Sequence, residues 1–193
     1  MRYETSVWFS LLMLFVAVLP LHAGDLKNPG FEEHGGWQIV TQGSSLQAAI
    51  GSDASQTGKK SFAVSLAGES PTQKEDFAGI VQVLELTKAD KGISFYVKDN
   101  YTGNTSRYHW MELLLDGEVI WEADVAGGNT DWRKVSLDLS RYLKHVKRSE
   151  IGRNKYRDES NYKITFRVFE RNGVNRFGIK VQVDNFKLLK ETP

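Results

Sequence analysis

Residues 26–33 read Leu26-Lys27-Asn28-Pro29-Gly30-Phe31-Glu32-Glu33, and they give the first indication of how the chain folds. A Pro-Gly turn is followed directly by an acidic side chain, and a second acid stands inside the last apolar run, Val183-Asp184-Asn185-Phe186. We interpret the two acids as a sign that the ends of the domain meet. Calcium would suit such a junction, because it takes about six to eight carboxylate and carbonyl oxygens from separate segments. Glu32 and Asp184 would supply the charge, and backbone carbonyls near Gly30 would supply further ligands.

Short apolar runs separated by turn residues fill the chain between these two segments. Residues 93–98 and 162–169 alternate between apolar and polar side chains, the period of two that is typical of a half-buried strand. Asp116-Gly117 predicts a tight hairpin turn, because this pair tolerates positive φ. No long helical period follows residue 24. The sequence therefore predicts an all-β fold, an antiparallel β-sandwich of the jelly-roll kind.

An ordered set of motifs also carries a family resemblance. The motifs are Asn28-Pro29-Gly30-Phe31-Glu32, Gly36-Trp37, Ser55-Gln56-Thr57-Gly58-Lys59-Lys60-Ser61-Phe62, Asp131-Trp132 ahead of Val135, Leu137 and Leu139, and Val183-Asp184-Asn185. In this order they resemble secreted carbohydrate-binding modules of the galactose-binding-like β-sandwich type, such as xylan- and glucan-binding modules. The resemblance implies a galactose-binding-like jelly roll that binds a polysaccharide without catalysis. It also implies a structural calcium ion held by the side chains of Glu32 and Asp184 and the carbonyls of Gly30 and Lys60.

A surface that binds sugars needs exposed rings for stacking and planar polar groups for paired hydrogen bonds. Strand alternation indicates which side chains point away from the core. These candidates for ligand binding are Gln82, Tyr96, Tyr108, Trp110, Glu112, Arg167 and Gln182. We expect them to share one sheet face, although a shift of one residue in register would turn each side chain to the opposite face.

The charge and cysteine content exclude several function classes. The 193 residues include 25 basic and 24 acidic side chains, so the formal charge of +1 gives no overall field to attract nucleic acid or an anionic membrane. A neutral ligand fits this balance better. The absence of Cys excludes disulfides, thiolate zinc sites and thiol nucleophiles. Core packing, aided by a metal ion, must then hold the fold.

The first 23 residues have the pattern of a secretory signal peptide. Arg2 precedes an apolar run over residues 7–19, and a small residue, Ala23, stands at the expected cleavage point. The run is shorter than the roughly 20 residues of a membrane-spanning helix, and Pro20 interrupts its end. We therefore expect a signal peptide over residues 1–23, one domain over 24–193, a secreted or periplasmic location, and no membrane span after cleavage.

One segment departs from the strand pattern. Residues 144–157 are rich in Lys and Arg and poor in apolar side chains. They indicate either a solvated loop or a basic lip that contacts an acidic polysaccharide or a partner protein.

Catalytic motifs are scarce. The chain has neither a His-Glu-x-x-His metal motif nor a Gly-x-Ser-x-Gly nucleophile motif. We predict a non-catalytic module, which could still assist a glycoside hydrolase. Two alternatives stay open: an extracellular structural or adhesive domain that binds a secreted protein partner, and a jelly-roll polysaccharide lyase or hydrolase.

Overall fold

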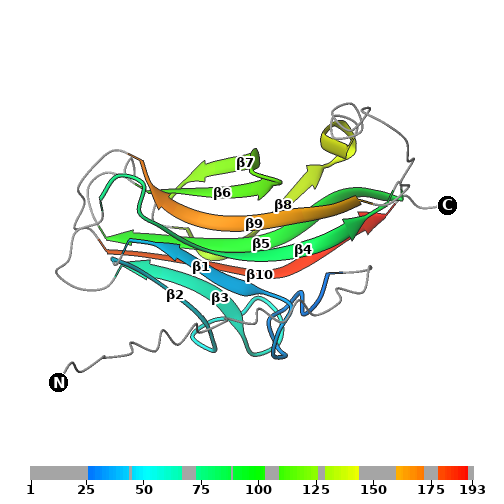
Figure 1. Ribbon diagram of the computed structural model, residues 1–193. Coiled ribbons are helices and arrows are strands. Elements are labelled where there is room, and N and C mark those ends of the chain that lie inside the picture. The colour runs from blue at the N-terminus through cyan, green and yellow to red at the C-terminus, as the bar shows by residue number, and fades with distance from the viewer. Residues whose placement is uncertain are drawn as a thin grey trace, which may run out of the picture.

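Two antiparallel sheets, each of five strands, lie face to face (Figure 1) in the computed structural model, which describes residues 26–43, 45–66, 73–87, 89–102, 109–125, 129–143, 160–171 and 178–190. Sheet A has the order β1 (Gln38–Gln42), β4 (Phe77–Leu86), β9 (Ser160–Glu170), β6 (His109–Leu115) and β7 (Glu118–Asp124). Sheet B has the order β2 (Leu46–Gly51), β3 (Ser61–Leu66), β10 (Gly178–Lys190), β5 (Asp90–Thr102) and β8 (Asn129–Asp138). The predicted all-β antiparallel sandwich is confirmed.

Alternating side chains explain why these segments form strands that pack on one side. In β9, Ile164, Phe166 and Val168 are fully buried, whereas Lys163, which precedes Ile164, is exposed. In Figure 1, β9 is bowed, and its concave side faces away from β10 of the other sheet. The side of sheet A that faces away from sheet B is called the outer face of sheet A below.

The turn between β6 and β7 has the predicted form. Asp116 and Gly117 have φ angles of 50° and 87°, so both central residues are left-handed, as a two-residue hairpin of this type requires. Asp116 and Gly117 therefore determine where the chain reverses direction between β6 and β7.

Aromatic rings join the amino-terminal segment to the core. The Phe186 ring lies 4.9 Å from that of Trp37 and stacks on that of Phe95 at 5.1 Å between centroids. Phe31 is fully buried beside both Trp37 and Phe186. Because burial of each such ring contributes about 2–3 kcal/mol, residues 26–37 belong to the folded core.

The segments around Pro29 and Phe186 meet, as the acids Glu32 and Asp184 led us to expect. The Phe186 amide donates a hydrogen bond to the carbonyl of Pro29, at 3.0 Å. The pairing of β10 with β5 shifts register between Asp184 and Lys187, so that Val183 and Phe186 both face the core.

Some predictions fall outside the described residues: the signal peptide over residues 1–23, Tyr108, and the basic segment 144–157. Just before that segment, residues 140–143 form one helical turn, with the Leu143 amide bonded to the Leu139 carbonyl at 3.0 Å. In the part of the chain that the structure describes, no helix has the length and apolar character that a membrane span requires.

Candidate functional site

The loop between β2 and β3 binds two acids that are far apart in the sequence, Glu32 and Asp184. This loop, residues 52–60, is called the clasp loop below. Asp184 Oδ2 accepts hydrogen bonds from the amides of Gln56 and Thr57, at 2.8 and 3.0 Å. Glu32 Oε1 accepts hydrogen bonds from the amides of Lys59 and Lys60, at 2.7 and 2.8 Å. Four backbone N–H groups of one loop therefore hold the first and last segments together.

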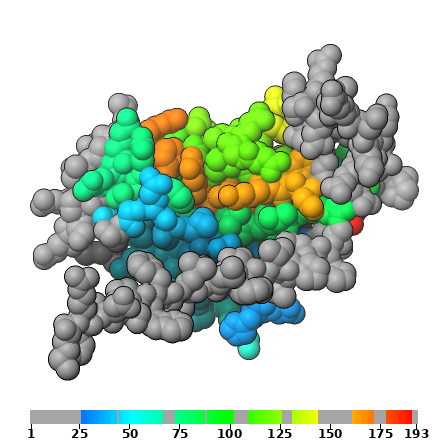
Figure 2. Space-filling view, in the orientation of Figure 1, coloured from blue at the N-terminus to red at the C-terminus, as the bar shows by residue number. Residues whose placement is uncertain are grey.

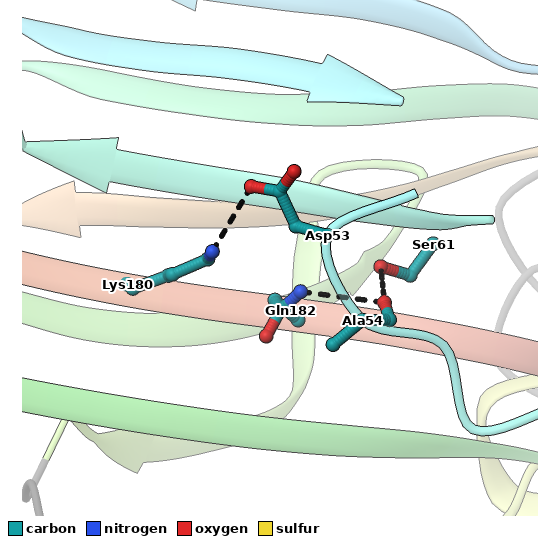
Figure 3. Close-up of polar contacts among 5 residues, drawn as sticks. All are labelled: Asp53, Ala54, Ser61, Lys180 and Gln182. Atoms are coloured by element: carbon teal, nitrogen blue, oxygen red, sulfur yellow. Dashed lines mark hydrogen bonds and ion pairs between the residues drawn. The ribbon is translucent and has the colours of Figure 1, made fainter. Parts of the chain in front are cut away.

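Further contacts fix the clasp loop on sheet B. Figure 3 shows Gln182 Nε2 and Ser61 Oγ both donating to the carbonyl of Ala54, the former at 3.3 Å. It also shows Lys180 Nζ paired with Asp53 at 3.0 Å. Gln182 is 4% exposed. Gln182 points outward as predicted, but the clasp loop covers its amide, and its part in ligand binding stays a prediction.

Glu32 and Asp184 lie in different environments. Backbone N–H groups of Lys60 and Lys59 lower the pKa of Glu32. Burial raises the pKa of Asp184, against the opposite effect of the amides of Thr57 and Gln56, and the negative charge of Glu32 raises it further. The two carboxylates are thus close enough to repel each other.

The predicted calcium ligands can be tested against this geometry. Gly30 lies against Asp184, since a Cβ on Gly30 would be 3.7 Å from Asp184 Oδ1, and Lys60 borders Glu32 through its amide. All four predicted residues therefore converge at the clasp loop. Among the described residues, no group of three or more His, Cys, Asp or Glu side chains is placed to hold a metal. A cation here would rely on two carboxylates and neighbouring carbonyls, the oxygen types that calcium binds. It would have to share them with the N–H groups bonded to Glu32 Oε1 and to both oxygens of Asp184, and with the Lys60 ammonium bonded to the Glu32 carbonyl.

A second polar cluster lies on the outer face of sheet A. Glu112 of β6 and Arg167 of β9 stand directly opposite each other. Arg167 Nε and Nη2 approach Glu112 Oε2 at 2.8 and 2.7 Å, and the Glu112 side chain is only 5% exposed. The guanidinium also lies over the rings of Phe77 and Phe169, with centroid distances of 5.6 and 5.1 Å. Rings on two sides and a carboxylate on a third fix the position of Arg167.

Gly79 makes room for this arginine. It pairs with Arg167 across β4 and β9, and a Cβ on Gly79 would lie 2.9 Å from Arg167 Cα and 2.3 Å from the Phe166 carbonyl. A larger residue would push β4 and β9 apart. The glycine therefore allows the close approach that brings Phe77 next to Arg167.

A third group continues the same face toward β7. The Arg171 guanidinium lies over the Trp110 ring at 4.2 Å, and its Nη2 is 3.6 Å from Glu122 Oε2. In Figure 2, atoms of β9 lie at the surface between those of β4 and those of β6 and β7. The outer face of sheet A thus presents three rings, two guanidinium groups and two carboxylates across four adjacent strands, β4, β9, β6 and β7.

Only part of the predicted ligand surface is brought together. Trp110, Glu112 and Arg167 share the outer face of sheet A. Tyr96 lies on the opposite side of the molecule, on the outer face of sheet B, where it pairs with Lys134 and Asp184. The expectation of a single face is therefore wrong, because alternation shows that a side chain points outward but does not show which sheet its strand joins.

Gln82 faces the core, contrary to prediction. It pairs with the fully buried Ile164, and side chains opposite each other across a ladder share a face. Its amide nitrogen donates to the carbonyls of Lys27 and Gly36 at 2.9 and 2.7 Å, and its oxygen accepts from the Lys27 amide at 2.8 Å. The prediction failed because β4 is apolar on both faces, so its alternation does not identify the buried side.

Four residues of the site were not predicted: Phe77, Phe169, Arg171 and Glu122. Strand alternation could have predicted Phe169 and Arg171, because they are two and four residues after the outward-facing Arg167. Glu122 stands opposite Glu112 on β7. A register shift between Leu113 and Leu114 brings it there, because an unshifted two-residue hairpin would place Glu122 opposite Met111.

No protein-family model matches the chain, and no curated protein sequence matches it. Solved structures share its fold. The carbohydrate-binding module TmCBM61, in complex with β-1,4-galactotriose, aligns over 86% of this chain and 97% of its own, with 19% identity and a TM-score of 0.50. A chain from a study of promiscuous specificity in carbohydrate-binding modules of the β-sandwich superfamily aligns over 87% of this chain and 63% of its own, with 12% identity and a TM-score of 0.51. The family 11 carbohydrate-binding module of a cellulosomal cellulase of Clostridium thermocellum aligns over 88% and 96%, with 17% identity and a TM-score of 0.48. At such identities the likeness concerns the fold, and this protein has the two-sheet antiparallel β-sandwich fold found in carbohydrate-binding modules.

Proposed function

We propose that this protein is a non-catalytic carbohydrate-binding module that holds a polysaccharide on the outer face of sheet A. The observation that carries the proposal is the arrangement of Trp110, Phe169 and Phe77 around the Glu112–Arg167 pair. Rings offer apolar faces to the C–H groups of sugars, and a planar ion pair offers donors and acceptors to their hydroxyls. The known ligand of TmCBM61, a galactotriose, supports the proposal at the level of the fold.

The charge on this face favours a neutral glycan. The register places four acidic and three basic side chains outward on sheet A within the described residues: Glu85, Glu112, Glu122, Asp124, Lys163, Arg167 and Arg171. The acids and bases nearly cancel. A polyanionic chain would gain little attraction from such a surface, whereas hydroxyl groups find both kinds of hydrogen-bonding partner.

Affinity electrophoresis tests the proposal. Gels containing a β-1,4-galactan, a mixed-linkage β-glucan or a xylan should slow the protein, and Trp110→Ala should abolish the retardation by at least one of them. Tyr96→Ala is the matched control, because it removes a half-buried ring from the outer face of sheet B. Binding that is lost in Tyr96→Ala and kept in Trp110→Ala would indicate that the site lies on sheet B instead. No retardation by any of the polysaccharides would overturn the function.

The proposal includes a structural calcium ion at the clasp loop. Its ligands would be the carboxylates of Glu32 and Asp184 and the carbonyls of Gly30 and Lys60. A bound cation would offset the repulsion between the two acids and tie both chain ends to the loop. Because an ion that binds only the folded state stabilises it, calcium should raise the melting temperature above that in chelator. Glu32→Gln should reduce this difference, and equal melting temperatures in calcium and chelator would count against the ion.

The proposal also includes export. Residues 1–23 carry the signal pattern, and a polysaccharide ligand would be met outside the cytoplasm. Expression of the full chain, followed by amino-terminal sequencing of the protein in the medium or periplasm, should give a product that begins at Gly24. A product that keeps Arg2 and stays in the cytoplasm would contradict export.

A further inference from the structure

The ring best placed to stack on a sugar is covered by an arginine. Arg171 Cζ lies 4.2 Å from the centroid of the Trp110 indole, so its guanidinium covers one side of that ring. A pyranose ring cannot stack on the same side while Arg171 remains there. Stacking of a sugar on this side of Trp110 therefore requires Arg171 to move.

Arg171 is held more weakly than its neighbour Arg167. The side chains of Arg171 and Glu122 are 43% and 47% exposed, and their closest atoms are 3.6 Å apart, too long for a hydrogen bond. An exposed ion pair of this kind contributes little. Each arginine lies over two rings, since Arg171 is also 6.0 Å from the centroid of Phe169, but only Arg167 makes two short contacts to a nearly buried carboxylate, that of Glu112. Of the two guanidinium groups on this face, Arg171 is the one that can be displaced.

Two buried polar atoms beside Arg171 find no partner among the described residues. They are Trp110 Nε1 and Asp124 Oδ1. Trp110 and Asp124 stand directly opposite each other on β6 and β7 and so share the outer face of sheet A. Folded proteins rarely leave such atoms unpaired, and each exception calls for an explanation. One atom is a donor and the other an acceptor, and a hydroxyl group can satisfy both at once.

We propose that Trp110 and Asp124 form a sugar subsite that Arg171 masks in the free protein. A neutral pyranose displaces the guanidinium and stacks on the indole. One of its hydroxyls accepts a hydrogen bond from Trp110 Nε1 and donates one to Asp124 Oδ1. This inference rests on the proposed function and adds its selectivity: the carboxylates of Asp124 and Glu122 repel a uronic acid at this position.

Calorimetric titration tests whether Arg171 masks the subsite, a role called the mask below. The purified protein would be titrated with the β-1,4-galactan, the mixed-linkage β-glucan and the xylan. Arg171→Ala should bind at least one of them about three- to tenfold more tightly than the wild type, because the cation–π contacts to Trp110 and Phe169 and one weak ion pair no longer compete. Trp110→Phe keeps a ring but loses the N–H, and it should bind about three- to tenfold more weakly. Arg141→Ala is the matched control, because Arg141 lies over the Tyr142 ring at 5.3 Å on the helical turn at residues 140–143. It removes the same charge and the same kind of contact, and its affinity should equal that of the wild type.

The outcomes separate the mask from the proposed function. If the wild type binds and Arg171→Ala binds equally or more weakly, the mask is wrong and the function stands. If the wild type binds none of the polysaccharides but Arg171→Ala binds one, the mask is supported. If neither protein binds any of them, both proposals are overturned. Tighter binding of polygalacturonate than of the neutral chains by the wild type would also overturn the subsite, because its acids exclude such a ligand.

Discussion

Glu112 and Arg167 face each other across β6 and β9, and two nitrogens of the guanidinium approach one oxygen of the nearly buried carboxylate. A buried carboxylate that loses its partner is costly, and so is a guanidinium that has been placed between two rings. The pair therefore has two roles: it stabilises the centre of sheet A, and it presents polar atoms at the surface proposed for sugar binding.

Replacement of Glu112 should destabilise the protein more than replacement of Glu122, the exposed partner of Arg171. Glu112→Ala should lower the free energy of unfolding by about 2 kcal/mol, because the hydrogen bonds to the charged Arg167 are lost in a largely buried site. Glu122→Ala removes the exposed partner of Arg171 and should cost less than about 0.5 kcal/mol. Urea unfolding curves measure both. Similar losses in the two variants would show that burial does not distinguish the pairs.

Gln82 should behave as a structural residue. Gln82→Leu leaves the backbone groups of Lys27 and Gly36 without their partner and should lower the free energy of unfolding by about 2–4 kcal/mol. The control is Gln42→Leu, since Gln42 is exposed and makes one 3.3 Å contact to the Glu75 carbonyl. A stable Gln82→Leu protein that fails only in glycan binding would restore Gln82 to the ligand site.

His109 should make stability depend on pH. Burial lowers the pKa of His109 from 6.5 to about 4, although Glu170 Oε2 is 3.3 Å from its Nε2. Between these values the unfolded chain binds a proton that the folded protein does not, so the free energy of unfolding falls as the pH drops from about 6.5 to about 4, by as much as about 3 kcal/mol. Above about pH 6.5 this group has no effect.

Urea unfolding at several pH values tests this dependence. The free energy of unfolding should decline less steeply with falling pH in His109→Gln than in the wild type, whereas removal of the exposed His34 should leave the slope unchanged. An identical slope in His109→Gln and the wild type would refute the assignment.

Gly58 should be required for the clasp loop. Its φ is +71°, and a Cβ would lie 2.3 Å from Glu32 Oε1. Gly58→Ala should therefore destabilise the protein by more than about 1 kcal/mol, through backbone strain and through loss of the Glu32 contacts. Gly51→Ala is the control, because a Cβ there meets nothing within 4 Å. Differential scanning calorimetry gives both values, and a Gly58→Ala protein as stable as Gly51→Ala would mean that Glu32 is not held by the loop.

The local pattern of residues predicted much of the fold and some of the site. Alternation identified Glu112 and Arg167 as outward because their strands are apolar on one face around them. The same rule failed at Gln82, where Val81 and Val83 make the outer face of β4 apolar as well. The hairpin was predictable because Asp116-Gly117 fixes its own backbone.

The remaining differences between prediction and structure have a non-local cause. Tyr96 does point away from the core, but pairing between distant strands decides which sheet β5 joins. Gln182 also points outward, and it is buried by a loop more than a hundred residues earlier in the chain. A contact of that kind leaves no trace in the residues around Gln182.

Heteronuclear NMR on the ¹⁵N-labelled protein tests the central claim most directly. An oligosaccharide of the polysaccharide that retards the protein most would be added, and two sets of signals followed: the indole of Trp110 with the Arg167 Nε–H, and the backbone amides of Tyr96 and Lys134. Binding on the outer face of sheet A predicts progressive shifts in the first set and none in the second. Shifts confined to Tyr96 and Lys134, or none in either set at millimolar sugar, would contradict the account.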